Sequence, residues 1–190
     1  KFRTNTMIPA FDHNFVLPPH TGNPTLPEQI SPYKCTTEEL CSNFATSAKR
    51  IEILEGFLLF RQQLSRFGLV RGFQWLDGSF LENVEIRENR SPNDLDLVTV
   101  YWGYDLGFQQ QLIIDFPEFA DTDLSKSNYK LDHYPFDAGH SPMNTVEYTR
   151  YWIQLFSHNR DAVWKGMLHI ELNTPNEDQE AIKILKSIKV

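Results

Sequence analysis

The chain has 190 residues, which favours a single domain, and 41% of them are hydrophobic, enough to form a sizeable core. Its net charge of -7 argues against a protein that holds long nucleic acid through the phosphates, because such binding depends on clustered Lys and Arg. No run approaches the roughly 18 apolar residues of a membrane span, and the first residues lack the order of a signal peptide. We therefore expect a cytoplasmic protein.

The first 34 residues are predicted to form a proline-rich N-terminal arm. Six of the eleven prolines lie in the first 32 residues, which excludes helix interiors and paired central strands from most of this region. The arm also carries apolar side chains, so we expect it to pack on a single domain of residues 35–190. Those side chains are Ile8, Phe11, Phe15, Val16 and Leu17.

Two helices are predicted next. Thr36 and Glu39 have the spacing of a capping box, so a short helix should begin there and run to about Ala45. The only cysteines, Cys35 and Cys41, flank this start without the spacing of a zinc site, and we expect them to be reduced and structural. A longer helix should follow, ended by Gly68, with one apolar stripe formed by Ile53, Phe57, Phe60, Leu64 and Phe67.

The stretch from Gly72 to Tyr101 carries the candidate chemistry. Phe73 to Leu76 is a short aromatic and apolar run typical of a buried strand, and it stops at Asp77-Gly78-Ser79, after which a helix over Phe80 to Ile86 is predicted. A glycine and a serine at the first turn of a helix form a ready anion site. Gly78 and Ser79 are therefore predicted to bind phosphate.

A second strand is predicted from Asp94 to Val100. Alternation along a strand places Asp94 and Asp96 on one face, with Leu95 and Leu97 on the other. Two carboxylates on one face can share a divalent metal, and hard oxygen ligands of this kind suit Mg²⁺ held together with substrate phosphates.

The next segments are predicted as a helix over Asp105 to Ile114, a polar loop over Asp121 to Asn128, and a strand over Tyr129 to Phe136 with Asp132 near its centre. Asn144 is predicted to cap a helix that runs through Trp152 to Phe156.

The chain should end in a strand and a helix. Gly166 to Leu172 is predicted as the strand, and Thr174-Pro175-Asn176-Glu177 combines a capping box with proline at the first helical position. The last helix should turn Ile182, Leu185 and Ile188 inward. Taken together, the elements predict an α/β (α+β) protein with a small mixed sheet flanked by helices.

The pattern resembles the nucleotidyltransferase superfamily that includes DNA polymerase beta. In that superfamily a Gly-Ser turn is followed by Asp-x-Asp on the next strand and a third Asp on a later strand; here Gly78-Ser79, Asp94-x-Asp96 and Asp132 are similar. The stretches MIPAFDHNFVLPP and YWIQLFSHNRDAVWKGMLHIEL resemble a minimal prokaryotic branch of the superfamily.

The resemblance implies a metal-dependent enzyme that transfers an NMP, most simply AMP from ATP, to a hydroxyl of a protein or small-molecule acceptor. Gly78 and Ser79 would bind the nucleotide phosphates, and Asp94, Asp96 and Asp132 would bind Mg²⁺ or Mn²⁺. Asp132 would also serve as the general base. A toxin-like protein partner, as in the adenylylating antitoxins of the minimal type, is an acceptor that this resemblance suggests.

Other interpretations stay open. The chain could be a non-catalytic binding module of the same fold, such as an antitoxin or regulatory subunit. Glu171 could replace Asp132 as the third carboxylate. Arg160 and Lys165 could contact a phosphate or a partner, or lie at the surface. A metal-dependent nuclease is disfavoured, because no lysine follows Asp-x-Asp at the spacing common in such sites.

Overall fold

The computed structural model describes residues 8–188 and has an α+β architecture around a five-stranded mixed sheet, as predicted. The strand order is β1-β5-β2-β3-β4. β2 runs antiparallel to both of its neighbours, while β1 pairs with β5 and β3 pairs with β4 in parallel. The strands are β1 (Tyr33–Lys34), β2 (Gly72–Asp77), β3 (Leu95–Tyr101), β4 (Leu131–Asp137) and β5 (Leu168–Glu171).

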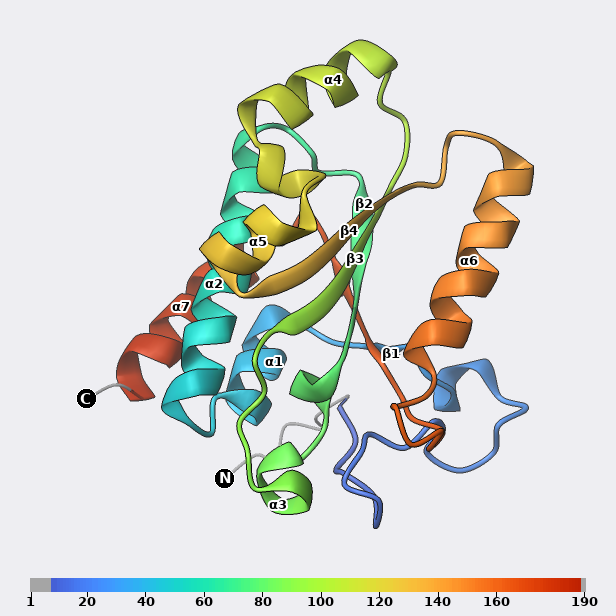
Figure 1. Cartoon of the computed structure of the whole chain (residues 1–190), viewed down its shortest axis with the longest axis vertical. Helices are drawn as coiled ribbons and strands as arrows, with labels where there is room; N and C mark the ends of the chain where they lie inside the picture. Colours follow the sequence, from blue (N-terminus) through green and yellow to red (C-terminus); the bar gives the residue numbers. More distant parts are fainter. Residues whose placement is uncertain (1–7, 189–190) are drawn as a thin grey trace.

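Helices cover the two faces of the sheet unequally (Figure 1). Four of them lie on one face and enclose the larger apolar core: α1 (Thr37–Phe44), α2 (Ala48–Arg66), α5 (Thr122–Tyr129) and α7 (Pro175–Ile188). The other face packs on α6 (Pro142–Phe156) through a smaller core that includes Trp75, Trp152 and Phe156. α4 (Leu106–Asp115) lies at one end of the sheet. Within residues 8–188, no helix is long and apolar enough to cross a membrane.

The predictions for the first two helices are confirmed. Thr36 and Glu39 form the capping box of α1, and the predicted stripe of α2 from Ile53 to Leu64 is buried. Phe67 is the C-cap residue of α2, and Gly68 follows with a φ of 82°, a conformation that favours glycine. Cys35 and Cys41 are free and buried.

The helix predicted over Phe80 to Ile86 is wrong. Directly after Gly78 the chain forms only a three-residue 3-10 turn, η2 (Ser79–Leu81), and the next helix, α3 (Val84–Glu88), has a single turn. Phe80 and Leu81 are fully buried, so core packing, not a helix axis, directs this segment. A helix dipole aimed at a phosphate beside Gly78 and Ser79 is therefore not part of the fold.

The polar loop predicted over Asp121 to Asn128 is also wrong, because this segment is α5. The Asp121 carboxylate accepts a hydrogen bond from the Leu124 N–H at 3.0 Å and caps the helix. The buried Ser125 hydroxyl donates to the Leu131 carbonyl at 2.9 Å. The strand predicted to begin at Tyr129 begins at Leu131, since Tyr129 ends α5 and Lys130 takes a left-handed turn.

Two details of the last helices differ from the prediction. Ser141, not Asn144, caps α6: its hydroxyl accepts from the Asn144 N–H at 3.2 Å, and Pro142 takes the first helical position. In α7 the buried residues are Asp178, Ala181 and Leu185, whereas Ile188 is 46% exposed.

The N-terminal arm contributes to both the core and the sheet. Ile8, Val16 and Leu17 are buried, and Val16 forms a β-bridge with Glu82 beside the candidate phosphate turn. A short 3-10 turn, η1 (Pro27–Gln29), precedes β1, whose pairing with β5 was not anticipated from the proline-rich sequence.

A chain of buried polar groups crosses the core between α2 and β4. The Arg61 guanidinium donates to the Gln74 side-chain oxygen at 2.7 Å, and the Gln74 amide donates to the Thr99 hydroxyl at 3.1 Å. The Thr99 hydroxyl oxygen also lies 2.8 Å from His133 Nε2, and the tautomer of the imidazole decides which of the two groups donates. The chain ends at a neutral imidazole packed 4.6 Å from the Phe60 ring.

His133 should make the fold sensitive to acid. Burial lowers the pKa of its imidazole to about 3 from an ordinary value of 6.5. Below pH 6.5 the unfolded chain therefore binds a proton at His133 that the folded chain does not bind. The contribution of His133 to the free energy of unfolding is complete above pH 6.5 and is lost as the pH falls toward 3. We expect His133→Gln to flatten the fall by up to about 1.4 kcal/mol for each pH unit.

Urea unfolding at several pH values between 3 and 7 measures this slope. The matched control is His140→Gln, which removes an exposed histidine and should leave the wild-type slope unchanged. Equal slopes for His133→Gln and the wild type would contradict the assignment.

Candidate active site

Three neighbouring strands place carboxylates in one row across the sheet. Asp77 at the end of β2 is the register partner of Asp96 on β3, and Asp96 is the register partner of Asp132 on β4. Register partners on adjacent strands point to the same face, and their Cβ atoms lie roughly 5 Å apart. Asp94 lies one pleat before Asp96 and joins the cluster. The sheet thus brings together all three predicted carboxylates and a fourth, Asp77, which the sequence predicts only as a turn residue.

Lys126 on α5 joins two of these carboxylates. Its ammonium nitrogen lies 2.7 Å from Asp94 Oδ2 and 3.5 Å from Asp132 Oδ2. The lysine side chain is 49% exposed, whereas those of Asp94 and Asp132 are 15% and 21% exposed. A half-exposed cation thus lies against a more buried pair of acids and offsets part of their negative charge.

The electrostatics of Asp96 reflect the crowding. Burial, together with the negative charges of Asp94 and Asp132, raises the pKa of Asp96 to about 6. Lys165 and Lys126 oppose that rise. The four carboxylates of Asp77, Asp94, Asp96 and Asp132 outnumber the two lysines beside them, which favours binding of a further cation.

Gly78 is required at the turn next to Asp96. Its φ is 82°, and a Cβ atom on this residue would lie 1.7 Å from Asp96 Oδ2. Only glycine allows both the backbone conformation and the close approach. The neighbouring Ser79 side chain is partly exposed and makes no side-chain hydrogen bond within residues 8–188, so its hydroxyl is available to a ligand.

Lys165 holds this turn in place through buried contacts. Its ammonium lies 2.9 Å from Asp77 Oδ1 and 2.8 Å from Glu82 Oε1, and it donates to the Gly78 carbonyl at 3.2 Å. The lysine side chain is only 2% exposed. Burial raises the pKa of Asp77 to about 7, and the charge of Lys165 opposes that rise. The sequence leaves open whether Lys165 contacts a phosphate or a partner or lies at the surface. Its buried contacts show that it supports the turn.

Arg50 on α2 holds the segment that follows the turn. Its guanidinium donates to the carbonyls of Phe80 and Glu82 at 2.6 Å each and forms an ion pair with Glu85. These bonds satisfy buried backbone groups that no helix satisfies here. The position of Ser79 is therefore set by two buried cations, Arg50 and Lys165, and neither was recognisable from local sequence spacing.

The donor set suits a hard divalent cation such as Mg²⁺. The available ligands are carboxylate oxygens, and Asp132 Oδ1 is buried without a hydrogen-bond partner among the described residues. The Lys126 ammonium already occupies a cation position between Asp94 and Asp132. In the arrangement that residues 8–188 adopt, no three His, Cys, Asp or Glu side chains converge on a single metal position. For Asp94, Asp96 and Asp132 to share one ion, their carboxylates and the Lys126 ammonium would have to move from these positions.

Glu171, the alternative third carboxylate, lies at the other end of the sheet. It is the register partner of Phe73, four residues along β2 from Asp77, which corresponds to roughly 13 Å. Its carboxylate contacts His169 at 3.1 Å and Lys34 at 3.9 Å. The geometry favours Asp132 over Glu171 as the neighbour of Asp96.

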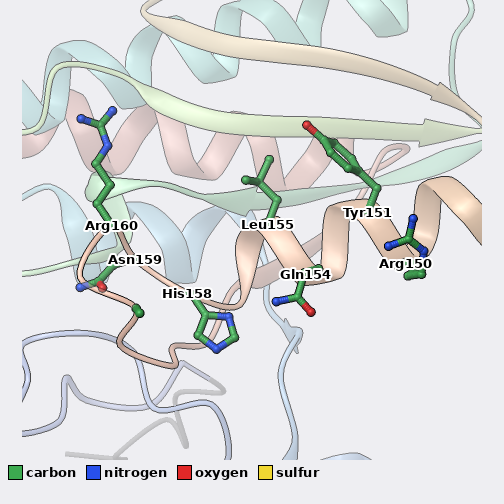
Figure 2. Close-up of a pocket in the computed structure, with 8 residues that line it drawn as sticks. Arg150, Tyr151, Gln154, Leu155, His158, Asn159 and Arg160 are labelled. Atoms are coloured by element: carbon green, nitrogen blue, oxygen red, sulfur yellow. The ribbon is translucent and has the colours of Figure 1, made fainter.

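A separate pocket of about 640 Å³ lies on α6 and the loop that follows it (Figure 2). Trp152 and Phe156 turn toward the sheet, so at 100° per residue the pocket residues occupy the opposite, outward side of the helix. Figure 2 shows Tyr151 and Leu155 leaving one side of α6 and His158 the other. None of the carboxylates Asp77, Asp94, Asp96 and Asp132 lines the pocket. It is lined by Arg150, Tyr151, Gln154, Leu155, His158, Asn159, Arg160 and Ala162.

Comparison with known proteins places the chain in a family. No curated protein and no solved structure matches it. The family described as "Family of unknown function (DUF6932)" matches residues 9–171, which include the four clustered aspartates, the Gly78-Ser79 turn and the supporting cations Arg50 and Lys165. Because the match covers most of its length, this chain belongs to the DUF6932 family.

Proposed function

We propose that the protein is a Mg²⁺-dependent nucleotidyltransferase that moves an NMP, most simply AMP from ATP, onto a hydroxyl of a protein or small-molecule acceptor. The observation that carries the proposal is the register of Asp96 with both Asp77 and Asp132. The backbone of Gly78 packs directly against the Asp96 carboxylate. Such a row sets carboxylates beside a turn with an available serine hydroxyl, an arrangement suited to a metal-bound triphosphate.

Each residue has a role in this reaction. The acceptor oxygen forms a bond to the α-phosphorus while the bond from that phosphorus to the bridging oxygen of the β-phosphate breaks, and pyrophosphate leaves. Asp132 accepts the proton of the acceptor hydroxyl. Ser79 donates a hydrogen bond to a phosphate oxygen, and Gly78 allows the phosphates to approach the backbone. Bound Mg²⁺ supplies neutralisation of the charge that develops on the attacking and leaving oxygens.

Label transfer tests the proposal. ATP labelled at the α-phosphate is incubated with the protein, Mg²⁺ and candidate acceptor proteins. We expect Asp96→Asn and the double variant Asp94→Asn/Asp96→Asn to lower the transfer rate at least about 1,000-fold, because the carboxylates act together. The matched control is Glu171→Gln, which removes a carboxylate from the far end of the same sheet and should retain the wild-type rate.

The enzyme proposal ends if the wild type shows neither label transfer nor metal-dependent nucleotide binding. Equal loss in Glu171→Gln and Asp96→Asn would instead overturn the assignment of the site to Asp96, since that result would reflect general damage to the sheet.

A non-catalytic binding module of the same fold, such as an antitoxin or regulatory subunit, is the second candidate. The outward face of α6 favours it: Met143, Val146, Tyr151 and Leu155 are each at least 50% exposed there, beside Arg150 and the pocket. Exposed apolar and aromatic residues with arginine are typical of protein interfaces. Both functions agree with a cytoplasmic protein whose two buried cysteines stay reduced. Retention of partner binding by Asp94→Asn/Asp96→Asn would distinguish this role from catalysis.

A further inference from the structure

We propose that Lys126 is an internal cation of the site: its ammonium takes the place of a divalent cation between Asp94 and Asp132, and it would turn to the triphosphate when a metal-bound nucleotide is present. This inference rests on the proposed function and adds a residue and a sequence of events to it. The observation behind it is the pair of distances from one ammonium to two acids on different strands, 2.7 Å to Asp94 and 3.5 Å to Asp132.

Lys126 is much the more exposed of the site's two lysines, with 49% of its side chain exposed against 2% for Lys165. Lys165 is buried and held by two carboxylates and a carbonyl. Lys126 is half exposed in the last turn of α5, so other rotamers of its flexible four-carbon chain would carry the ammonium into solvent. A divalent cation shared by Asp94 and Asp132 would repel the ammonium, because the two would compete for the same carboxylate oxygens.

The displaced ammonium has a natural destination. The phosphates of a bound nucleotide carry the largest negative charge that enters the site, and lysine is a common phosphate ligand. The same side chain thus weakens binding of the metal alone and strengthens binding of the metal together with the triphosphate. Lys126 makes binding of metal and nucleotide interdependent.

The test separates the two effects by measuring each ligand alone. Isothermal titration gives the affinity for MgCl₂ without nucleotide, and then the affinity for α,β-methylene ATP at saturating Mg²⁺. We expect Lys126→Gln to bind Mg²⁺ about threefold to fivefold more tightly, the scale of a partly exposed ion pair. It should bind the Mg²⁺-saturated nucleotide at least about fivefold more weakly. Lys126→Arg should restore nucleotide binding.

Thermal unfolding adds a readout that does not require activity. Without its counter-ion, the acid pair of Lys126→Gln should gain more from Mg²⁺, so the rise in Tm on adding Mg²⁺ should be larger than in the wild type. The matched control is Lys183→Gln, which removes an exposed lysine paired with Glu180 on α7. It should reproduce the wild type in every measurement.

A merely structural role of Lys126 would not raise the affinity for Mg²⁺ while it lowers the affinity for the nucleotide. Weaker binding of both ligands by Lys126→Gln, or no change in either, overturns the proposal for Lys126. If the wild type transfers label normally in those cases, the proposed function stands and only the role of Lys126 fails. If the wild type binds neither Mg²⁺ nor nucleotide, both proposals fail together.

Discussion

Replacing Arg61 with leucine should lower the free energy of unfolding by about 3 to 5 kcal/mol. The side chain is completely buried, and its guanidinium bonds both Asp178 oxygens at 3.0 Å, the Gln74 side chain at 2.7 Å and the Thr174 hydroxyl at 2.7 Å. A leucine would fill part of the volume but would leave the Asp178 carboxylate buried without its partner. Urea unfolding at pH 7 measures the change.

The matched control is Arg66→Leu, on an exposed turn of the same helix, which should change stability by less than about 0.5 kcal/mol. Arg61→Lys should recover only part of the loss, because an ammonium cannot reproduce the fork of donors. A cost for Arg61→Leu no greater than that for Arg66→Leu would show that the network contributes nothing to stability.

Lys165→Met should be nearly as damaging, with a loss of about 3 kcal/mol, and it should also impair the active site. The methionine would leave Asp77 and Glu82 facing each other in the core without the cation between them. The Gly78 carbonyl would lose its donor, so the turn beside Asp96 would no longer be fixed. Nucleotide binding should therefore fall together with stability.

The double variant Lys165→Met/Asp77→Asn tests this explanation, because it removes one charge of each sign. It should recover part of the stability lost in Lys165→Met, and the size of the recovery measures the coupling of the pair. The control is Lys49→Met, which breaks an exposed ion pair with Glu52 and should cost at most about 1 kcal/mol. Additive effects of Lys165→Met and Asp77→Asn would contradict the assigned contact.

Local patterns predicted most of the fold because they depend on neighbours in sequence. The capping box at Thr36, the stripe of α2 and the alternation around Asp96 each follow from the geometry of one element. The failures occurred where tertiary packing overrode a weak local signal. Phe80 and Leu81 enter the core as a 3-10 turn, and α5 depends on the cap at Asp121 and the buried Ser125 hydroxyl.

The candidate site was predictable only in part for the same reason. Asp94, Asp96 and Asp132 could be proposed from spacing and resemblance, and the parallel pairing of β3 with β4 sets Asp96 opposite Asp132. The lysines could not. Lys126 lies on a helix that looked like a loop, and Lys165 reaches Asp77 across 88 positions of the sequence. Contacts between distant segments leave no periodic signal in the chain.

The order of the strands has a consequence for the time at which the protein can fold. β5, which ends at Glu171, lies between β1 and β2, so β1 has no partner in the sheet until β5 has been synthesised. Non-local pairing of this kind closes a long loop before it gains contacts and is slow. A nascent chain stalled after α6 would expose one edge of β2, a template for pairing with other chains. Completion of the sheet thus waits for β5.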